Sequence, residues 1–214
     1  MRLVDPETGQ PYVEKRRRRY NLSGEPRELT FSCYRQYPFL ASDRTRGWFR
    51  EAVEGARRKY SVQVWAYVVM PDHVHLLIAP VARPEAARSV TEVAPETTLA
   101  DPISPFLQAV KEPVARLALA YLRAHAPEWL TRVRVREGNR VRYRFWQPGG
   151  GYDRNVHDPS TLRSMIDYIH ANPVRRGLAT TAEDWEWSSA RWFARIQPAW
   201  IEMDAAVIDF LTIR

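Results

Sequence analysis

Two histidines one residue apart are the first feature of this sequence that could support chemistry. His73 and His75 flank Val74 in the segment HVHLLI, which is rich in strand-forming residues. Residues two apart in a strand share a face, so the two imidazoles project side by side while Val74 faces the opposite side. Imidazole is a common ligand of transition metals, and the pair therefore indicates a metal site. The spacing fits equally well two polar residues on the solvated face of a strand.

A tyrosine and an asparagine four residues apart are the second such feature. Tyr168 and Asn172 lie in the segment MIDYIHANPVRRG, and on a helix they would share one face. The phenol could act as a nucleophile, and the amide oxygen could serve as a third metal ligand. Structural roles are also open, because Tyr168 could be a core aromatic and Asn172 could cap the helix before Pro173.

The pattern of apolar residues predicts the elements that would position these groups. The predicted elements are strands at 29–34, 62–69 and 73–78 and helices at 43–60, 103–125 and 161–172. Met70-Pro71-Asp72 suits a hairpin turn, Pro113 is expected to kink or split its helix, and Asn172-Pro173 should end the last one. Strands and helices mixed without regular βαβ alternation favour an α+β fold with an antiparallel sheet.

Composition limits the class of protein. A chain of 214 residues with 45% hydrophobic residues can bury a core of one domain. The single cysteine, Cys33, excludes an internal disulfide and a cysteine-based zinc cluster, and it fits a reducing compartment. Asp72, His73 and His75 interrupt the longest apolar stretch, and no secretory signal is visible at the start. We therefore expect a soluble, cytoplasmic protein without a membrane partner.

The charge is strongly basic and unevenly distributed. The formal net charge is +7, and only three of the 32 basic residues are lysines. Ten arginines and four acidic residues lie between positions 131 and 176. Arginine presents a planar fork that suits phosphate, so a polyanionic partner is expected and nucleic acid is the obvious one. A solvated basic surface is the simpler alternative.

Three groups of arginines are candidate DNA-binding residues. Positions 131–145 alternate arginine with apolar residues around Glu137-Gly138-Asn139, which predicts a hairpin with one arginine-lined face. The run at 15–19 predicts a flexible basic arm, and two further arginines follow the Tyr168 helix. The candidates are Arg16, Arg17, Arg18, Arg19, Arg132, Arg134, Arg136, Arg140, Arg142, Arg144, Arg175 and Arg176.

The glycine-rich segment 147–152 is predicted to be a loop. Tyr152 at its end is a rival nucleophile, because such a loop could swing it inward. Trp146 and Tyr152 could stack on unpaired bases, although burial is the more usual fate for a residue such as Trp146. His125 suits a structural role at a helix end, and His157 could serve a turn or bind a phosphate.

Four segments taken together resemble the REP-associated tyrosine transposases, which belong to the single-tyrosine HUH superfamily. The segments are VVMPDHVHLLI, FWQPGGGYDRN, YIHANPVRRGL and DWEWSSARW. The resemblance extends from about Leu29 to Phe193, which is most of the chain. It implies a ferredoxin-like antiparallel sheet that carries the histidines centrally, with a nearby helix that presents the tyrosine.

The resemblance also implies roles for individual residues. His73 and His75 match the metal-binding pair, Tyr168 matches the catalytic tyrosine, and Asn172 matches the residue that completes the metal site. The implied activity is that of a single-stranded DNA endonuclease and strand transferase, which acts on hairpin DNA through a 5′-phosphotyrosine with Mg²⁺ or Mn²⁺. The implied organisation is a basic arm at 1–27, a catalytic domain at 28–193 with a mobile loop at about 81–102, and a tail at 194–214 packed on the domain.

Two other functions remain open at the level of sequence. A domesticated relative could bind hairpin nucleic acid without cutting it. A metallohydrolase could use His73, His75 and a carboxylate without a covalent intermediate. A monomer is expected rather than a dimer.

Overall fold

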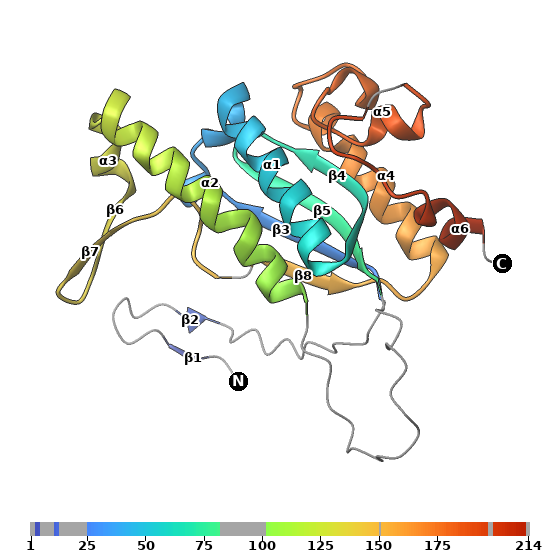
Figure 1. Ribbon diagram of the computed structural model, residues 1–214, viewed down its shortest axis with the longest axis horizontal. Helices are drawn as coiled ribbons and strands as arrows, with labels where there is room; N and C mark the ends of the chain where they lie inside the picture. Colours follow the sequence, from blue (N-terminus) through green and yellow to red (C-terminus); the bar gives the residue numbers. More distant parts are fainter. Residues whose placement is uncertain are drawn as a thin grey trace, which may run out of the picture.

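A four-stranded antiparallel sheet is the centre of the protein (Figure 1). The computed structural model describes residues 3–4, 11–12, 25–81, 102–149, 151–196 and 199–212. In spatial order the strands are β4 (Val62–Val69), β5 (His73–Pro80), β3 (Arg27–Ser32) and β8 (Tyr152–Asn155). Short β1 (Leu3–Val4) and β2 (Pro11–Tyr12) pair with each other in a separate antiparallel ribbon.

The connections between the strands of the sheet identify the topology. Along the chain the order is β3, α1 (Asp43–Tyr60), β4, β5, α2 (Ile103–His125) and β8. This is a βαββαβ unit whose two helices lie together on one face of the sheet (Figure 1). The expected ferredoxin-like α+β fold is confirmed.

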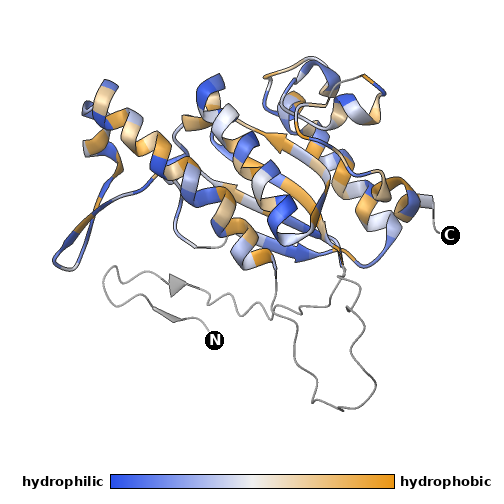
Figure 2. Ribbon diagram, viewed as in Figure 1, coloured by the Kyte–Doolittle hydropathy of each residue, from blue (hydrophilic) through white to orange (hydrophobic). Residues whose placement is uncertain are grey.

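Strand β5 supplies both faces of the sheet with side chains. Val74, Leu76 and Ile78 are fully buried in the core beneath α1 and α2, which contribute Phe49 and Phe106. The alternate residues of β5 point to the other face, as the strand repeat of two requires. Figure 2 shows apolar residues concentrated on the central strands and hydrophilic residues on the outward helix surfaces.

Helix α4 (Pro159–Arg175) covers part of that second face. It begins after Asp158, whose carboxylate accepts a hydrogen bond of 2.8 Å from the Thr161 N–H, and proline at the first position favours the start. Its buried residues, which include Leu162 and Ile169, pack on β4 and β5. The second core therefore lies between α4 and the sheet.

The expected end of α4 at Asn172-Pro173 is wrong, because the helix continues to Arg175. Pro173 has no N–H to donate to the carbonyl of Ile169. The Asn172 side-chain amide approaches that carbonyl at 3.4 Å and also donates to the Tyr168 carbonyl at 2.8 Å. The side chain thus partly replaces the missing backbone bond and allows one further turn. Pro113 likewise lies inside α2 without splitting it.

Strand β8 is not among the predicted elements, because Tyr152 is the only usual strand former in its sequence YDRN. It pairs with β3, and Tyr152 lies opposite Thr30. The glycine before it is required by space as well as conformation: Gly151 has a φ of 76°, and an added Cβ would lie 2.0 Å from the Thr30 carbonyl oxygen.

The arginine-rich segment forms the predicted hairpin, of β6 (Arg134–Glu137) and β7 (Arg140–Tyr143), which extends away from the sheet (Figure 1). The expectation that the hairpin begins at Thr131 is wrong, since 131–133 belong to the short helix α3 (Glu128–Val133). The expectation that the arginines line one face of the hairpin is also wrong. Arg134 lies opposite Tyr143 and Val135 opposite Arg142, so the two-residue turn places arginines on both faces.

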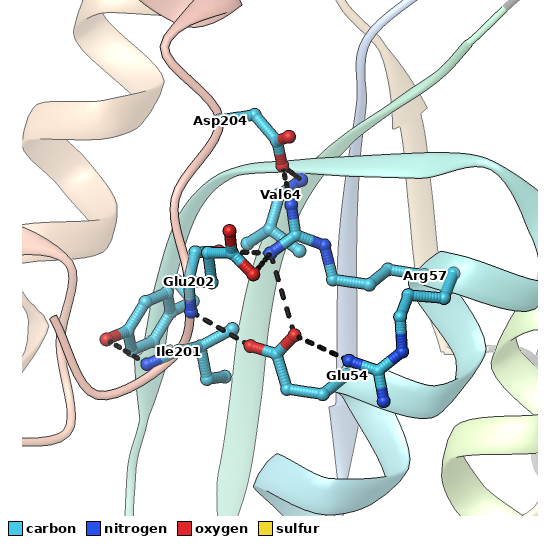
Figure 3. Close-up of polar contacts among 8 residues, drawn as sticks. Glu54, Arg57, Val64, Ile201, Glu202 and Asp204 are labelled. Atoms are coloured by element: carbon cyan, nitrogen blue, oxygen red, sulfur yellow. Dashed lines mark hydrogen bonds and ion pairs between the residues drawn. The ribbon is translucent and has the colours of Figure 1, made fainter.

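The C-terminal part of the chain closes the outer edge of β4. Backbone bonds join Val69 N–H to the Trp187 carbonyl at 2.9 Å and Asp204 N–H to the Val64 carbonyl at 3.1 Å. Figure 3 shows the polar cluster that holds this segment: Arg57 of α1 binds Asp204 and the Glu202 carbonyl. This covers the edge that an unpaired strand would otherwise expose.

The remaining elements are short. They are α5 (Ala190–Phe193), α6 (Ala206–Thr212), which packs on α4, and single turns at Tyr34–Gln36, Phe39–Ala41 and Ala182–Asp184. In the part of the chain that the structure describes, every helix is too short or too polar to span a bilayer. Arg16, Arg17, Arg18 and Arg19 of the predicted basic arm and residues 82–101 of the predicted loop lie outside the described residues.

Candidate functional site

The two histidines share one face of β5, as the sequence predicts. Their ring centroids lie 5.1 Å apart at 78°, and the alternation of β5 places them on the side of the sheet that faces α4. On β3, Ser32 and Thr30 are their direct cross-strand neighbours. The pair is therefore central in the sheet, beside polar neighbours rather than in the apolar core.

Tyr168 lies next to this pair. Its ring centroid is 5.7 Å from that of His75 at an angle of 84°, although the two residues come from different elements. Tyr168 is 44% exposed, so the prediction of a core aromatic does not apply. The phenol and the imidazoles converge on one surface, where a strand and a helix that are far apart in sequence meet.

Each histidine has a polar partner at its Nδ1 atom. The Asp72 carboxylate lies 2.8 Å from Nδ1 of His73, and since a carboxylate only accepts, this nitrogen carries the proton. Nδ1 of His75 lies 2.9 Å from the Thr30 hydroxyl and 3.5 Å from the Glu28 carboxylate. Nε2 of each ring is therefore the atom left for a metal, which is the usual arrangement around metal-binding imidazoles.

Electrostatics favour the neutral, metal-binding form of His73. Burial lowers its pKa, and the neighbouring charges of His75 and Arg176 lower it further against the opposing effect of Asp72. Burial acts to raise the pKa of Asp72, but its hydrogen bonds and charge interactions with His73 and Arg176 outweigh this and lower it. The carboxylate stays ionised and the ring stays neutral at neutral pH.

Asn172 lies one helical turn after Tyr168 and is 8% exposed. Its amide nitrogen is engaged by the carbonyls of Tyr168 and Ile169, so the side-chain oxygen is the atom that remains for a metal. Among the described residues no cluster of three or more His, Cys, Asp or Glu side chains could hold a metal ion. An amide oxygen is a type of ligand that fits Mg²⁺ or Mn²⁺.

A groove of about 610 Å³ runs from the His75 and Tyr168 rings along α4. Its lining residues are Glu28, Thr30, His75, Tyr152, Arg154, Ser160, Thr161, Ser164, Met165 and Tyr168. Tyr152 belongs to β8 and already lines the groove, so the expectation of a swinging loop is wrong for this residue. Arg154 was missed as a site residue, because its position depends on the pairing of β8 with β3.

The two arginines after Tyr168 have different surroundings. The guanidinium carbon of Arg175 lies 5.2 Å from the centroid of the Tyr168 ring. Arg176 donates to the Asp72 carboxylate at 2.7 Å. Only Arg175 therefore sits directly beside the phenol, while Arg176 is engaged with the residue before the first histidine.

The hairpin arginines also differ from one another. Arg142 and Arg144 pair with Glu137 of the same hairpin, which reduces the charge they offer to a ligand. Arg132 lies over the Trp129 ring, and Arg136 donates to the Gly138 carbonyl. Arg134 and Arg140 are exposed and form no ion pair with another described residue.

Other candidate residues have structural surroundings. Trp146 is buried and donates to the Lys111 carbonyl at 2.8 Å. His125 ends α2, and His157 lies 2.9 Å from Glu25. His170 lies on the buried side of α4, 2.8 Å from the Ser189 hydroxyl, where burial lowers its pKa to about 4.

Comparison with known proteins finds similarity to the same family that the motifs resemble. No family model matches the chain. A curated protein of Haemophilus influenzae, named as a REP-associated tyrosine transposase, is 24% identical over 179 residues, which cover 78% of this chain and 85% of that protein. The similarity extends over most of both chains.

Two solved structures are similar to the fold. The structure of a REP-associated tyrosine transposase bound to a REP hairpin has a TM-score of 0.55 and 21% identity, and the match covers 89% of this chain and 93% of that one. A transposase structure from Deinococcus radiodurans has a TM-score of 0.39 and 19% identity, with 73% and 96% of the chains covered, which is too low to support an argument. In sequence and in fold, this chain thus resembles the REP-associated tyrosine transposases.

Proposed function

We propose that this protein is a metal-assisted single-stranded DNA endonuclease and strand transferase with Tyr168 as its nucleophile. The observation that carries the proposal is the convergence of three rings: His73 and His75 from β5 lie within 5.1 Å of each other, and Tyr168 from α4 lies 5.7 Å from His75. A buried or remote tyrosine would not be compatible with attack on a polymer.

Hairpin DNA is the proposed substrate. The structurally similar protein is described as bound to a REP hairpin, and the curated relative carries a transposase name. The net charge of +7 and the exposed arginines of the β6–β7 hairpin favour a polyanion. Arg154 and Tyr152 line the groove beside Tyr168, where they could contact the phosphate and a base of the strand to be cut.

The proposed reaction conserves the phosphodiester bond. The Tyr168 oxygen attacks phosphorus, the bond from phosphorus to the 3′ oxygen breaks, and the phenol loses its proton while the leaving oxygen gains one. The products are a 5′-phosphotyrosine and a free 3′-OH. A second 3′-OH reverses the step and joins the strand elsewhere, so no external energy source is needed.

The side chains of the site divide the remaining work. Nε2 of His73, Nε2 of His75 and the amide oxygen of Asn172 would hold Mg²⁺ or Mn²⁺, which supplies a Lewis acid for the phosphate. Arg175, beside the phenol ring, adds positive charge where the phosphate must approach. Thr30 and Glu28 hold the ring of His75 in its orientation.

The three converging rings belong to one chain, which supports action as a monomer. A second copy is not needed to bring the phenol to the histidines. We expect the reaction to take place in the cytoplasm, where the DNA substrate is found.

The test is the capture of a covalent protein–DNA adduct. Incubation with a labelled single strand that contains a hairpin, in the presence of Mn²⁺, should produce a band that resists denaturation. Tyr168→Phe should abolish it, whereas Tyr152→Phe should retain it, since Tyr152 lines the same groove without being the nucleophile. An adduct that survives in Tyr168→Phe and is lost in Tyr152→Phe would reverse the assignment.

The remaining functions have distinct outcomes in this assay. A hairpin-binding protein without cleavage activity would bind the strand equally well in EDTA and form no adduct. A metallohydrolase would cut without an adduct and would place solvent ¹⁸O in the product phosphate at the first step.

A further inference from the structure

We propose that Asp72 and Arg176 are positioning residues that couple the metal-binding histidine His73 to the helix that carries Tyr168. The inference rests on the proposed function, and it concerns residues to which the motifs assign no such role. The observation is a shared atom: Oδ1 of Asp72 accepts from Nδ1 of His73 at 2.8 Å and from Nη1 of Arg176 at 2.7 Å.

Backbone hydrogen bonds hold the β4–β5 turn, which carries the Asp72 carboxylate, in place. The Asp72 carbonyl accepts from Cys33 N–H at 2.8 Å, and the Pro71 carbonyl accepts from Leu40 N–H at 2.8 Å. Both donors belong to the segment that follows β3. The Asp72 side chain is 11% exposed, so the two hydrogen bonds to its carboxylate form with little competition from water.

Arg176 connects the β4–β5 turn to the end of α4. Its N–H bonds to the Asn172 carbonyl at 3.1 Å, so the residue continues directly from the last helical turn. The neighbouring Val174, Arg175 and Gly177 are exposed, so the chain at the end of α4 lies at the surface. The ion pair with Asp72 therefore fixes the part of α4 that bears Asn172 and, one turn earlier, Tyr168.

The geometry gives Arg176 a role that differs from that of Arg175. A sequence with two adjacent arginines suggests two equivalent phosphate ligands. Arg175 lies over the Tyr168 ring, whereas the Arg176 guanidinium is directed to a partly buried carboxylate. Loss of Arg176 should loosen both His73 and the end of α4, whereas loss of Arg175 should affect only the surface that DNA approaches.

The test measures Mn²⁺ affinity without DNA, by electron paramagnetic resonance and calorimetry on the full chain. Asp72→Ala should weaken binding about 10- to 100-fold, as is typical when the partner of a metal-binding imidazole is removed. Arg176→Gln should weaken it less, because His73 keeps its acceptor, and Arg176→Lys should restore part of the loss. Arg58→Gln, on the exposed outer surface of α1, is the control and should bind Mn²⁺ like the wild type.

A double-mutant cycle shows whether Arg176 acts through Asp72. The double variant Asp72→Ala/Arg176→Gln should bind Mn²⁺ no more weakly than Asp72→Ala alone. Wild-type affinity in Arg176→Gln would overturn the inference, and so would a fully additive loss in the double variant. Arg176→Gln is a surface change, so the test holds even if Asp72→Ala fails to fold.

The outcomes separate this inference from the proposed function. Mn²⁺ binding that follows the cycle without any covalent adduct would overturn the proposed reaction and support the coupling. A covalent adduct, together with an Mn²⁺ affinity that does not change in Arg176→Gln, would support the proposed reaction and overturn the coupling. A wild-type protein that binds no Mn²⁺ would overturn both.

Discussion

The two faces of the sheet differ in how completely helices cover them. On one face α1 and α2 lie side by side over an apolar core that includes Leu76, Phe49 and Phe106, all fully buried (Figure 1). On the other face α4 covers Leu77 and Ala79 but leaves a groove beside His75. The proposed site therefore lies on the face of the sheet that is less completely covered.

Strand β5 shows the division most clearly, because neighbouring residues belong to opposite sides. Leu76 joins the core under α1 and α2, whereas His75 contacts Tyr168 and the Thr30 hydroxyl. Since successive side chains alternate, one strand can hold a rigid core residue and a metal ligand within a single residue step. The rigid face keeps the histidines in place, and the open face leaves space for the DNA strand of the proposed reaction.

Substitutions of Leu76 and His75 should give the largest effects, the first on stability and the second on Mn²⁺ binding. Leu76→Ala should lower the free energy of unfolding by about 2–5 kcal/mol, because it leaves a cavity in the covered core. His75→Ala should abolish Mn²⁺ binding and the adduct with a smaller loss of stability, since water in the groove can solvate Thr30 and Glu28. Urea unfolding and Mn²⁺ titration of both variants measure this contrast, and equal losses of stability would break it.

His170 on the buried side of α4 should make the free energy of unfolding depend on pH. His170 is buried and its pKa is lowered to about 4, so between about pH 4 and 6.5 the unfolded chain binds more protons than the folded one. Stability should therefore fall as pH drops through this window, by up to about 3 kcal/mol. His170→Gln should flatten that dependence in urea unfolding at pH 7, 5.5 and 4. An unchanged slope would contradict the buried, neutral state of His170.

Exposed arginines should give the smallest effects, and they test whether DNA contacts extend beyond the groove. Arg134→Ala on the hairpin and Arg154→Ala in the groove should each reduce the slope of log affinity against log salt by about 0.7. Only Arg154→Ala should also slow adduct formation at saturating DNA. Arg58→Ala, on the outer surface of α1, is the control and should leave the slope unchanged.

Elements with strong patterns were predictable from sequence. The bounds expected for α1, α2 and β4 agree with the structure, because a periodic apolar face records both the type of element and the side it buries. Strand β8 was missed because its residues favour a strand only through pairing with β3. The last turn of α4 was missed because its continuation depends on the Asn172 side chain.

The site was predictable in part. The shared face of His73 and His75 follows from spacing, and the resemblance of the motifs indicated that Tyr168 would join them. Spacing says nothing of Arg154, of the Glu28 and Thr30 partners of His75, or of the division of the hairpin arginines between two faces. These depend on which strands pair and in which register.

Local chemistry in the sequence determined the strand that carries the paired imidazoles and the helix that carries the phenol, because alternation and helical periodicity act over a few residues. The tertiary structure alone decided that α4 covers the histidine face, and that Arg176 meets Asp72 across 104 positions of chain. Such contacts arise only when the apolar faces of all the elements are buried together. No spacing within a single segment records that outcome.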